Sequence, residues 1–326
     1  MGATRDPRID ILRFFGLSLL ILAHIGAPSI MHELRTFDVP LMVFVSGLAA
    51  MSSTGAYKMW HRTKRLVLPV WIFLIGFFLV SWVCHYLSAG DSQWDWSVVW
   101  SSFIFYKGIG FVWIIRVFLL VMLVSPLLRM VNESVRSQWG FLVLVLFGVI
   151  VQSVLFRISG VMPNGLFSII FVDYFLYLLG YSIILLVGMR VRYECSNKSF
   201  LVFAVIVVLL VWCMLFSFGP HHFCINSYKY PPQTVYILYG VSCSLLLWHL
   251  VSVTSLKFPP FLLWIGRNTI WLYLWHIPMV RLFNDMIGNW VLRYFCVYLG
   301  TLLIYGIQYQ VVSRCRNSLL KRYLLG

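Results

Sequence analysis

Hydrophobic positions along the chain fall into long runs that are separated by short polar segments. Ten windows are apolar and long enough to suggest helices that cross a bilayer, which takes about 20 such residues. They lie at about 10–27, 38–54, 66–88, 111–131, 139–158, 168–189, 199–219, 233–255, 260–280 and 290–312. The second is short, and 96–110 could be a re-entrant or interfacial piece. The pattern predicts an all-α fold, a polytopic transmembrane helical bundle of about ten spans.

The composition excludes a soluble globular protein. Hydrophobic residues make up 61% of the chain and charged residues 11%, and the mean hydropathy is +0.89. The net charge of +15 is spread over short loops, without a basic domain that could bind nucleic acid, so no nucleic-acid partner is expected. No extramembrane domain is apparent, and residues 1–326 are predicted to form a single integral-membrane domain.

The basic residues predict the orientation. With an even number of spans, both termini lie on one side of the membrane. Loops on that side hold sixteen of the 25 lysines and arginines, and loops on the opposite side hold six. By the positive-inside rule both termini are predicted to be cytoplasmic. The apolar run behind the N-terminus resembles a signal peptide, but Asp10 and Arg13 interrupt it, so it is expected to remain as the first span.

The first window contains three ionisable residues, Asp10, Arg13 and His24. Ionisable groups inside a bilayer are costly and usually mark function. At about 100° per residue, a continuous helix would place Arg13 and His24 on one face, roughly 16 Å apart along the axis. Arg13 alone is more simply explained by snorkelling to the headgroups. His24 could act as a general base or carry an acyl group itself, or hydrogen-bond within the bundle.

Two further elements are weak signals on their own. Ser46 and Gly47 in the second window would let helices approach closely, or line a substrate tunnel. Arg62 and Arg65 lie three residues apart, on one helical face of a predicted cytoplasmic segment. Topology alone demands positive charge there, but paired arginines also suit the phosphates of coenzyme A.

Two aromatic segments are candidates for substrate contact. Tyr228, Lys229 and Tyr230 precede two prolines in an outer loop, and could contact a sugar or anchor at the headgroups. Tyr273 and His276 share a helical face, although His276 is more simply a satisfied interfacial histidine.

Three other features remain without a role. Asp173 and Arg116 lie within predicted spans and could pair with each other or with Arg13. The outer-loop trio His221, His222 and Cys224 is thin evidence for a metal, and none is expected.

Five motifs in order resemble the acyltransferase family 3 membrane proteins, over roughly residues 8 to 312. They are Arg13-x10-His24 preceded by Asp10, Phe44-x-Ser46-Gly47, Arg62-x-x-Arg65 followed by Leu-Pro, Lys229-Tyr230-Pro231-Pro232, and a Gly-x-x-Thr-Ile-x-x-Tyr-x-x-His element at 266–276.

The resemblance implies an O-acetyltransferase of bacterial surface glycans in the inner membrane. Acetyl-CoA would be the cytoplasmic acyl donor, and a glycan hydroxyl, reached from the extracytoplasmic side, the acceptor. His24 would be catalytic with support from Arg13 and Asp10, and Arg62, Arg65 and Ser46 would serve the donor end. The residues alone also allow a transporter or flippase for a glycan lipid or small metabolite, since intramembrane charges and a polar passage suit both classes.

Overall fold

The computed structural model describes residues 5–51, 56–87, 94–191, 198–254 and 257–325. Helices dominate these ranges, and no β-strand occurs within them, in agreement with the predicted all-α class. The chain divides into two compact units, each assembled from separate stretches of sequence. Unit 1 contains residues 1–54 and 120–267, and unit 2 contains residues 55–119 and 268–326.

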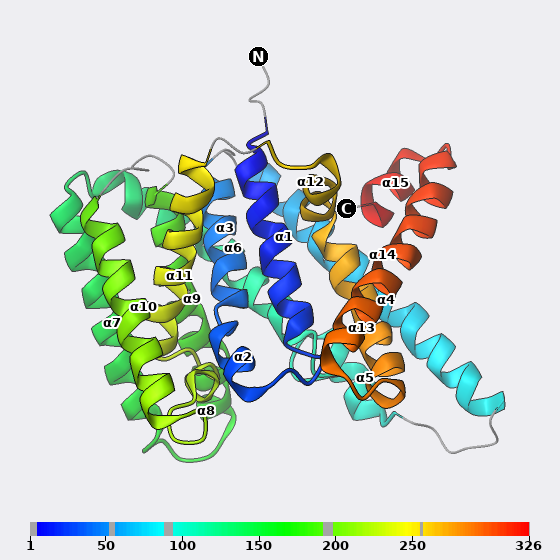
Figure 1. Ribbon diagram of the computed structural model, residues 1–326, viewed down its shortest axis with the longest axis horizontal. Helices are drawn as coiled ribbons and strands as arrows, with labels where there is room; N and C mark the ends of the chain where they lie inside the picture. Colours follow the sequence, from blue (N-terminus) through cyan, green and yellow to red (C-terminus); the bar gives the residue numbers. More distant parts are fainter. Residues whose placement is uncertain (1–4, 52–55, 88–93, 192–197, 255–256, 326) are drawn as a thin grey trace. The chain divides into compact units, whose positions relative to one another are not determined.

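The helices of unit 1 come from two stretches of the chain, 1–54 and 120–267 (Figure 1). They are α1 (Pro7–Leu22), α2 (Ser29–Leu34), α3 (Asp38–Ala50), α7 (Gln138–Ser159), α8 (Leu166–Ile170), the π-helix η1 (Phe171–Leu176), α9 (Tyr177–Val191), α10 (Lys198–Phe218), the 3-10 helix η2 (Ile225–Tyr228), α11 (Thr234–Val253) and α12 (Pro260–Arg267).

The helices of unit 2 are α4 (Ala56–Leu87), α5 (Trp96–Phe103), α13 (Thr269–Met286), α14 (Trp290–Arg314) and α15 (Ser318–Leu324). The chain passes between the units within α6 (Trp113–Ser134), at about Leu120. In unit 2, α13 packs along α14, and α4 packs against α13, α15 and α5.

Unit 1 is organised around α3, which packs against α1, α9 and α11. Leu41, Val43, Phe44 and Leu48 of α3 are fully buried. Gly47 lies against the backbone of α9, where an added Cβ would overlap the carbonyl oxygen of Leu185. Small residues allow helix backbones to approach closely, so packing rather than length holds this 13-residue helix in place.

Seven helices of the described chain are long and apolar enough to cross a membrane. They are Trp60–Leu87, Trp113–Ser134, Gln138–Ser159, Leu166–Val191, Leu201–Phe218, Thr234–Val253 and Trp290–Arg314. Each corresponds to a predicted window, so the multi-pass class is confirmed.

The other three predicted windows form shorter or interrupted helices. The first contains α1, which has 16 residues. The second contains α3, and its end at 52–54 lies outside the described residues. The window at 260–280 is divided at Asn268 between α12 and α13. The count of about ten spans, and with it the orientation of the termini, therefore stays a prediction.

Candidate active site

Asp10 lies at the centre of an arginine cluster at the start of α1. Its carboxylate is fully buried and accepts hydrogen bonds from Arg5, with Nη2 at 2.6 Å and Nε at 2.9 Å. The Nε atom of Arg267 donates to the same carboxylate at 3.1 Å, and Nη1 of Arg13 lies 3.7 Å away. We call Asp10 with Arg5, Arg13 and Arg267 the arginine cluster. Three guanidinium groups around one carboxylate leave two positive charges in excess.

Local sequence explains how the cluster forms. The Asp6 side chain caps α1 by accepting from the backbone N–H of Arg8, and Pro7 fits the first turn because the first N–H groups of a helix have no partner within it. Asp10 follows within the first turn, where the helix dipole favours a negative charge.

Gly266 brings α12 onto α1, and Figure 1 shows α12 beside the first turns of α1. An added Cβ at Gly266 would overlap the carbonyl oxygen of Asp10. This close approach places Arg267, the last residue of α12, at the Asp10 carboxylate.

His24 lies just beyond the other end of α1. The predicted helix to residue 27 is too long, because α1 ends at Leu22 and residues 23–26 form a turn. Gly26 adopts a positive φ of 64° in this turn, and Pro28 follows, so the helix cannot continue. His24 is half-buried, and its backbone N–H donates to the carbonyl of Ile21 at 3.0 Å. Helical spacing therefore fixes no direction for the His24 side chain relative to Arg13.

Ser46 lies in the middle of α3 and is half-buried. Its hydroxyl donates to the carbonyl of Met42, one turn earlier, at 2.9 Å. Gly47 is the residue that contacts α9, which agrees with the interpretation of this motif as a place of close helix packing. Contact of Ser46 with a donor stays a prediction.

A second polar cluster joins the α2–α3 corner to the segment before α11. Asp38 is buried and accepts from Arg35 at 2.7 Å and from Lys229 at 3.4 Å. Glu33 accepts from the backbone N–H of Asn226 at 2.8 Å. We call Glu33, Arg35, Asp38 and Lys229 the corner cluster. Its two carboxylates balance its two cationic groups. The contacts of Asp38 with Lys229 and of Glu33 with Asn226 hold the chain around residues 224–229 against α2 and α3.

The corner cluster changes the picture of the Tyr228–Tyr230 segment. Lys229 is 4% exposed, and burial lowers its pKa although the Asp38 carboxylate opposes that shift. Tyr228 ends η2 and lies against Phe223, whereas Tyr230 is half exposed. Lys229 is thus engaged in holding the fold, and Tyr230 is the residue of this segment with most surface available to a substrate.

Unit 2 holds the other candidates in two groups. Arg62 and Arg65 lie near the start of α4, where Nη2 of Arg322 on α15 is 3.2 Å from Nδ1 of His61. Tyr273 and His276 do share a face of α13. His276 is fully buried, and its Nδ1 contacts the carbonyl oxygen of Tyr273.

The Tyr273 hydroxyl donates to the carbonyl of Phe111, and the rings of Phe111 and His276 meet edge to face at 5.7 Å. These contacts place His276 in the interior of unit 2 rather than at an interface. The predicted contact of Tyr273 and His276 with a substrate stays untested.

The two other charges predicted within spans belong to different units. Arg116 is buried in unit 2 over the ring of Tyr106, and Asp173 lies in the π-helix η1 of unit 1. Within the described ranges, no group of three or more His, Cys, Asp or Glu side chains could hold a metal ion.

Arg5, Glu33 and Arg35 belong to polar clusters that the sequence did not predict. Each carries charge at or near a helix end, which is the only local signal that points to them.

These features define a class of protein: a helical membrane protein that carries buried, paired charges at the ends of short core helices. The family follows from comparison with known proteins. A family model described as an acyltransferase domain matches residues 6–307, so the chain belongs to the acyltransferase family 3 that its motifs resembled. No curated protein and no solved structure matches the chain. The protein is accordingly a membrane acyltransferase, which favours the enzyme over the transporter.

Proposed function

We propose that the protein transfers an acyl group, by default acetyl, from cytoplasmic acyl-CoA to a hydroxyl of a surface glycan at the bacterial inner membrane. One observation carries the proposal. Within unit 1, α1 begins at the arginine cluster, with its excess of positive charge, and is followed at its other end by His24. From Arg13 to Leu22 the helix spans about 14 Å. The arginine cluster and His24 are therefore separated along the helix axis by roughly half the thickness of a hydrocarbon core of about 30 Å.

The arginine cluster has the chemistry to bind phosphates. Coenzyme A carries a pyrophosphate and a 3′-phosphate, and guanidinium groups bind phosphate oxygens in bidentate fashion. Arg5, Arg13 and Arg267 retain 52%, 28% and 49% of their side-chain surface, so each can donate to a ligand while Asp10 holds it. Arg62 and Arg65 on α4 offer a further pair of the same kind.

In the proposed step, His24 acts as the general base. Its imidazole accepts the proton of the acceptor hydroxyl while the hydroxyl oxygen attacks the thioester carbonyl. The tetrahedral intermediate then collapses, the carbon–sulfur bond breaks, and the imidazolium returns the proton to the leaving thiolate as free coenzyme A forms. Atoms and charge balance, and no further reactant is required.

Replacement of His24 tests the catalytic assignment. In membranes supplied with radiolabelled acetyl-CoA and acceptor glycan, we expect His24→Ala to lower the transfer rate by about 100-fold or more, the scale of general-base catalysis. His222→Ala is the matched control because His222 is an exposed histidine, and it should keep the wild-type rate. Both variants are compared at equal amounts of monodisperse protein. A wild-type rate in His24→Ala would remove the assignment.

The donor end is tested in the same assay by Arg267→Gln and Arg62→Gln. Since phosphate binding contributes before the chemical step, each should raise KM for acyl-CoA several-fold and change kcat little. Arg157→Gln removes an exposed arginine at the end of α7 and should change neither constant. An unchanged KM for acyl-CoA in both test variants would show that neither Arg267 nor Arg62 binds the donor.

Two further measurements define the route and the acceptor. Incubation with labelled acetyl-CoA in the absence of acceptor should leave no label on denatured protein, whereas label that depends on His24 would show an acyl-histidine route. Mass spectrometry of surface glycans from cells with and without the protein should show the loss of one acyl mass.

A further inference from the structure

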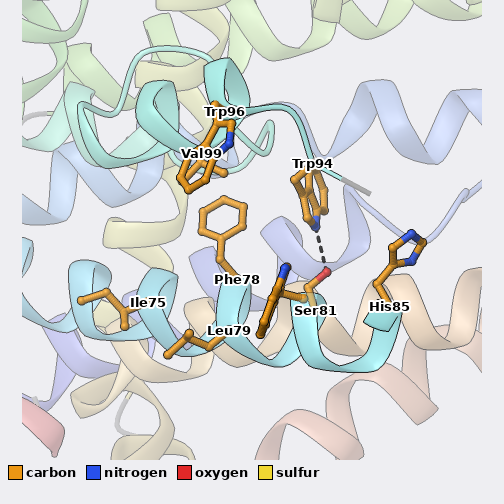
Figure 2. A pocket seen from close by; sticks show the side chains of 9 residues that line it. Ile75, Phe78, Leu79, Ser81, His85, Trp94, Trp96 and Val99 are labelled. Atoms are coloured by element: carbon orange, nitrogen blue, oxygen red, sulfur yellow. Dashed lines mark hydrogen bonds between the residues drawn. The ribbon is translucent and has the colours of Figure 1, made fainter. Parts of the chain in front are cut away.

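Unit 2 contains an apolar groove between the second half of α4 and the segment that forms α5. Its volume is about 590 Å³, within the range of ligand sites, about 300–1,000 Å³. Figure 2 shows the α4 side chains along one wall and Trp94, Trp96 and Val99 on the other. The lining residues are Ile75, Phe78, Leu79, Ser81, Trp82, His85, Trp94, Trp96 and Val99.

Specific contacts hold the two walls together. The indole N–H of Trp94 donates to the Ser81 hydroxyl at 2.9 Å, which Figure 2 marks with a dashed line. The indole N–H of Trp71 donates to the carbonyl of Phe103 at 3.1 Å. The Phe78 ring meets Trp94 edge to face at 5.9 Å. The groove is therefore part of a fixed arrangement rather than a gap between independent helices.

Two polar groups lie at the groove. The guanidinium of Arg281 lies 4.4 Å from the ring centre of Trp94 and 5.2 Å from that of Phe77, and no carboxylate in the described part of the chain pairs with it. The Nε2 atom of His85 is shielded from solvent and has no hydrogen-bond partner among the described residues. None of the described residues that line the groove is acidic. A positive rim and an apolar interior thus lie side by side.

The groove lies at the end of α4 remote from its arginines. The 20 residues from Arg65 to His85 rise about 30 Å, which equals the thickness of a bilayer's hydrocarbon core. Arg65 and His85 thus lie near opposite surfaces, and the groove begins at the second surface and extends towards the hydrocarbon. This is the position of a lipid whose head is at the interface and whose chain points inwards.

We infer that the groove binds one lipid of the surrounding membrane that has a net negative, phosphate-bearing head group. Its hydrocarbon chain lies against Phe78, Leu79 and Val99, and its phosphate accepts from Arg281. Charge complementarity decides the head group, because a guanidinium beside a groove whose described lining has no acidic residue favours an anion. The site does not depend on acyl transfer and shares no residue with the arginine cluster.

Photocrosslinking tests the site on the full-length protein. The probe is phosphatidylglycerol with a photoreactive group on its acyl chain, present as a minor component in nanodiscs of phosphatidylcholine. We expect crosslinked peptides from residues 75–87 and 94–99, and we expect unlabelled phosphatidylglycerol to compete about five-fold better than phosphatidylcholine, the scale of one basic residue near an anionic head. Crosslinks that avoid these peptides, or equal competition by both lipids, would overturn the inference.

Variants separate the chain from the head group. Val99→Trp fills the groove and should abolish these crosslinks, whereas Val80→Trp, at an exposed α4 position outside the lining, should leave them unchanged. Arg281→Gln should remove the preference for phosphatidylglycerol, and Arg281→Lys should retain it. If Val99→Trp does not fold, the two Arg281 variants decide alone. A preference that survives Arg281→Gln contradicts the inference.

Discussion

At the residue scale, Asp10 is a buried carboxylate that three arginines surround. The sequence suggested a catalytic role, and the structure buries the carboxylate completely among arginines. A buried charge without partners would be very costly, and here the guanidinium groups offset that cost. Asp10 is thus placed to hold Arg13 and Arg267 in position, and its catalytic role stays a prediction.

Glu33 provides a pH-dependent contact at the same scale. Burial alone would raise its pKa, but hydrogen bonds from His32, the Asn226 N–H and the Cys224 thiol lower the pKa below its ordinary value of 4.5. The unfolded chain therefore binds this proton more readily than the folded protein does. The stabilisation is present above about pH 4.5 and is lost as the pH falls through the lower, folded-state pKa.

We predict that the 224–229 segment opens more readily in acid than at neutral pH. Hydrogen exchange at the Asn226 amide, corrected for intrinsic rates, should progressively lose protection as the pH falls below 4.5. Glu33→Gln should already show weak protection at pH 7, because a neutral amide accepts less strongly than a carboxylate. Asp285→Asn, an exposed change in α13, serves as control. Equal protection in Glu33→Gln and the wild type at pH 7 would contradict this role.

At the element scale, glycines determine how closely helices pack in unit 1. Gly47 of α3 and Gly188 of α9 face each other, and an added Cβ at Gly188 would overlap the carbonyl oxygen of Phe44. Backbone atoms cannot move aside as the end of a flexible side chain can. In a membrane, where lipid is as apolar as leucine, such close contact is a main source of helix association.

We predict opposite effects for two glycine-to-alanine changes. Gly188→Ala should destabilise the protein by about 1–3 kcal/mol, since α3 and α9 must separate. Gly306→Ala in α14 meets no atom within 4 Å and should be neutral or stabilising by up to about 1 kcal/mol, because alanine is the better helix former. Thermal unfolding in the same detergent measures both. Equal unfolding temperatures would show that the contact contributes nothing.

At the scale of the whole molecule, the number of spans decides the orientation. Seven helices qualify by length and composition, and an odd number would place the termini on opposite sides. The ten predicted windows give an even number, which requires α1, α3 and the α12–α13 segment together to supply an odd number of further crossings; the basic residues then predict which side holds the termini. Ten spans result if each of the three crosses.

We predict that both termini are cytoplasmic. A fluorescent protein fused to either end should fold and fluoresce, and alkaline phosphatase fused to either end should be inactive, because the first requires the cytoplasm and the second an oxidising compartment. A phosphatase fusion after Pro220 should be active, as this loop is predicted to lie outside. Opposite results for the two termini would refute the even count.

Much of the fold could be predicted from the sequence, and less of the site. Apolar windows and helix boundaries are local properties, and all seven candidate spans lie where hydropathy predicted them. The end of α1 was predicted too far along, because apolar residues continue through a turn that Gly26 and Pro28 close. The contact of Lys229 with Asp38 was not predicted, because the two residues are 191 positions apart in the chain.

The sequence by itself determined the class and the family. Its apolar composition leaves only a helical membrane protein, because a bilayer satisfies no backbone polar group, and its ordered motifs agree with the matched acyltransferase family. Only the tertiary structure decided which charges meet. Arg267 reaches Asp10 across 257 positions because Gly266 lets two helix backbones touch, and no pattern of spacing along the chain encodes such a contact.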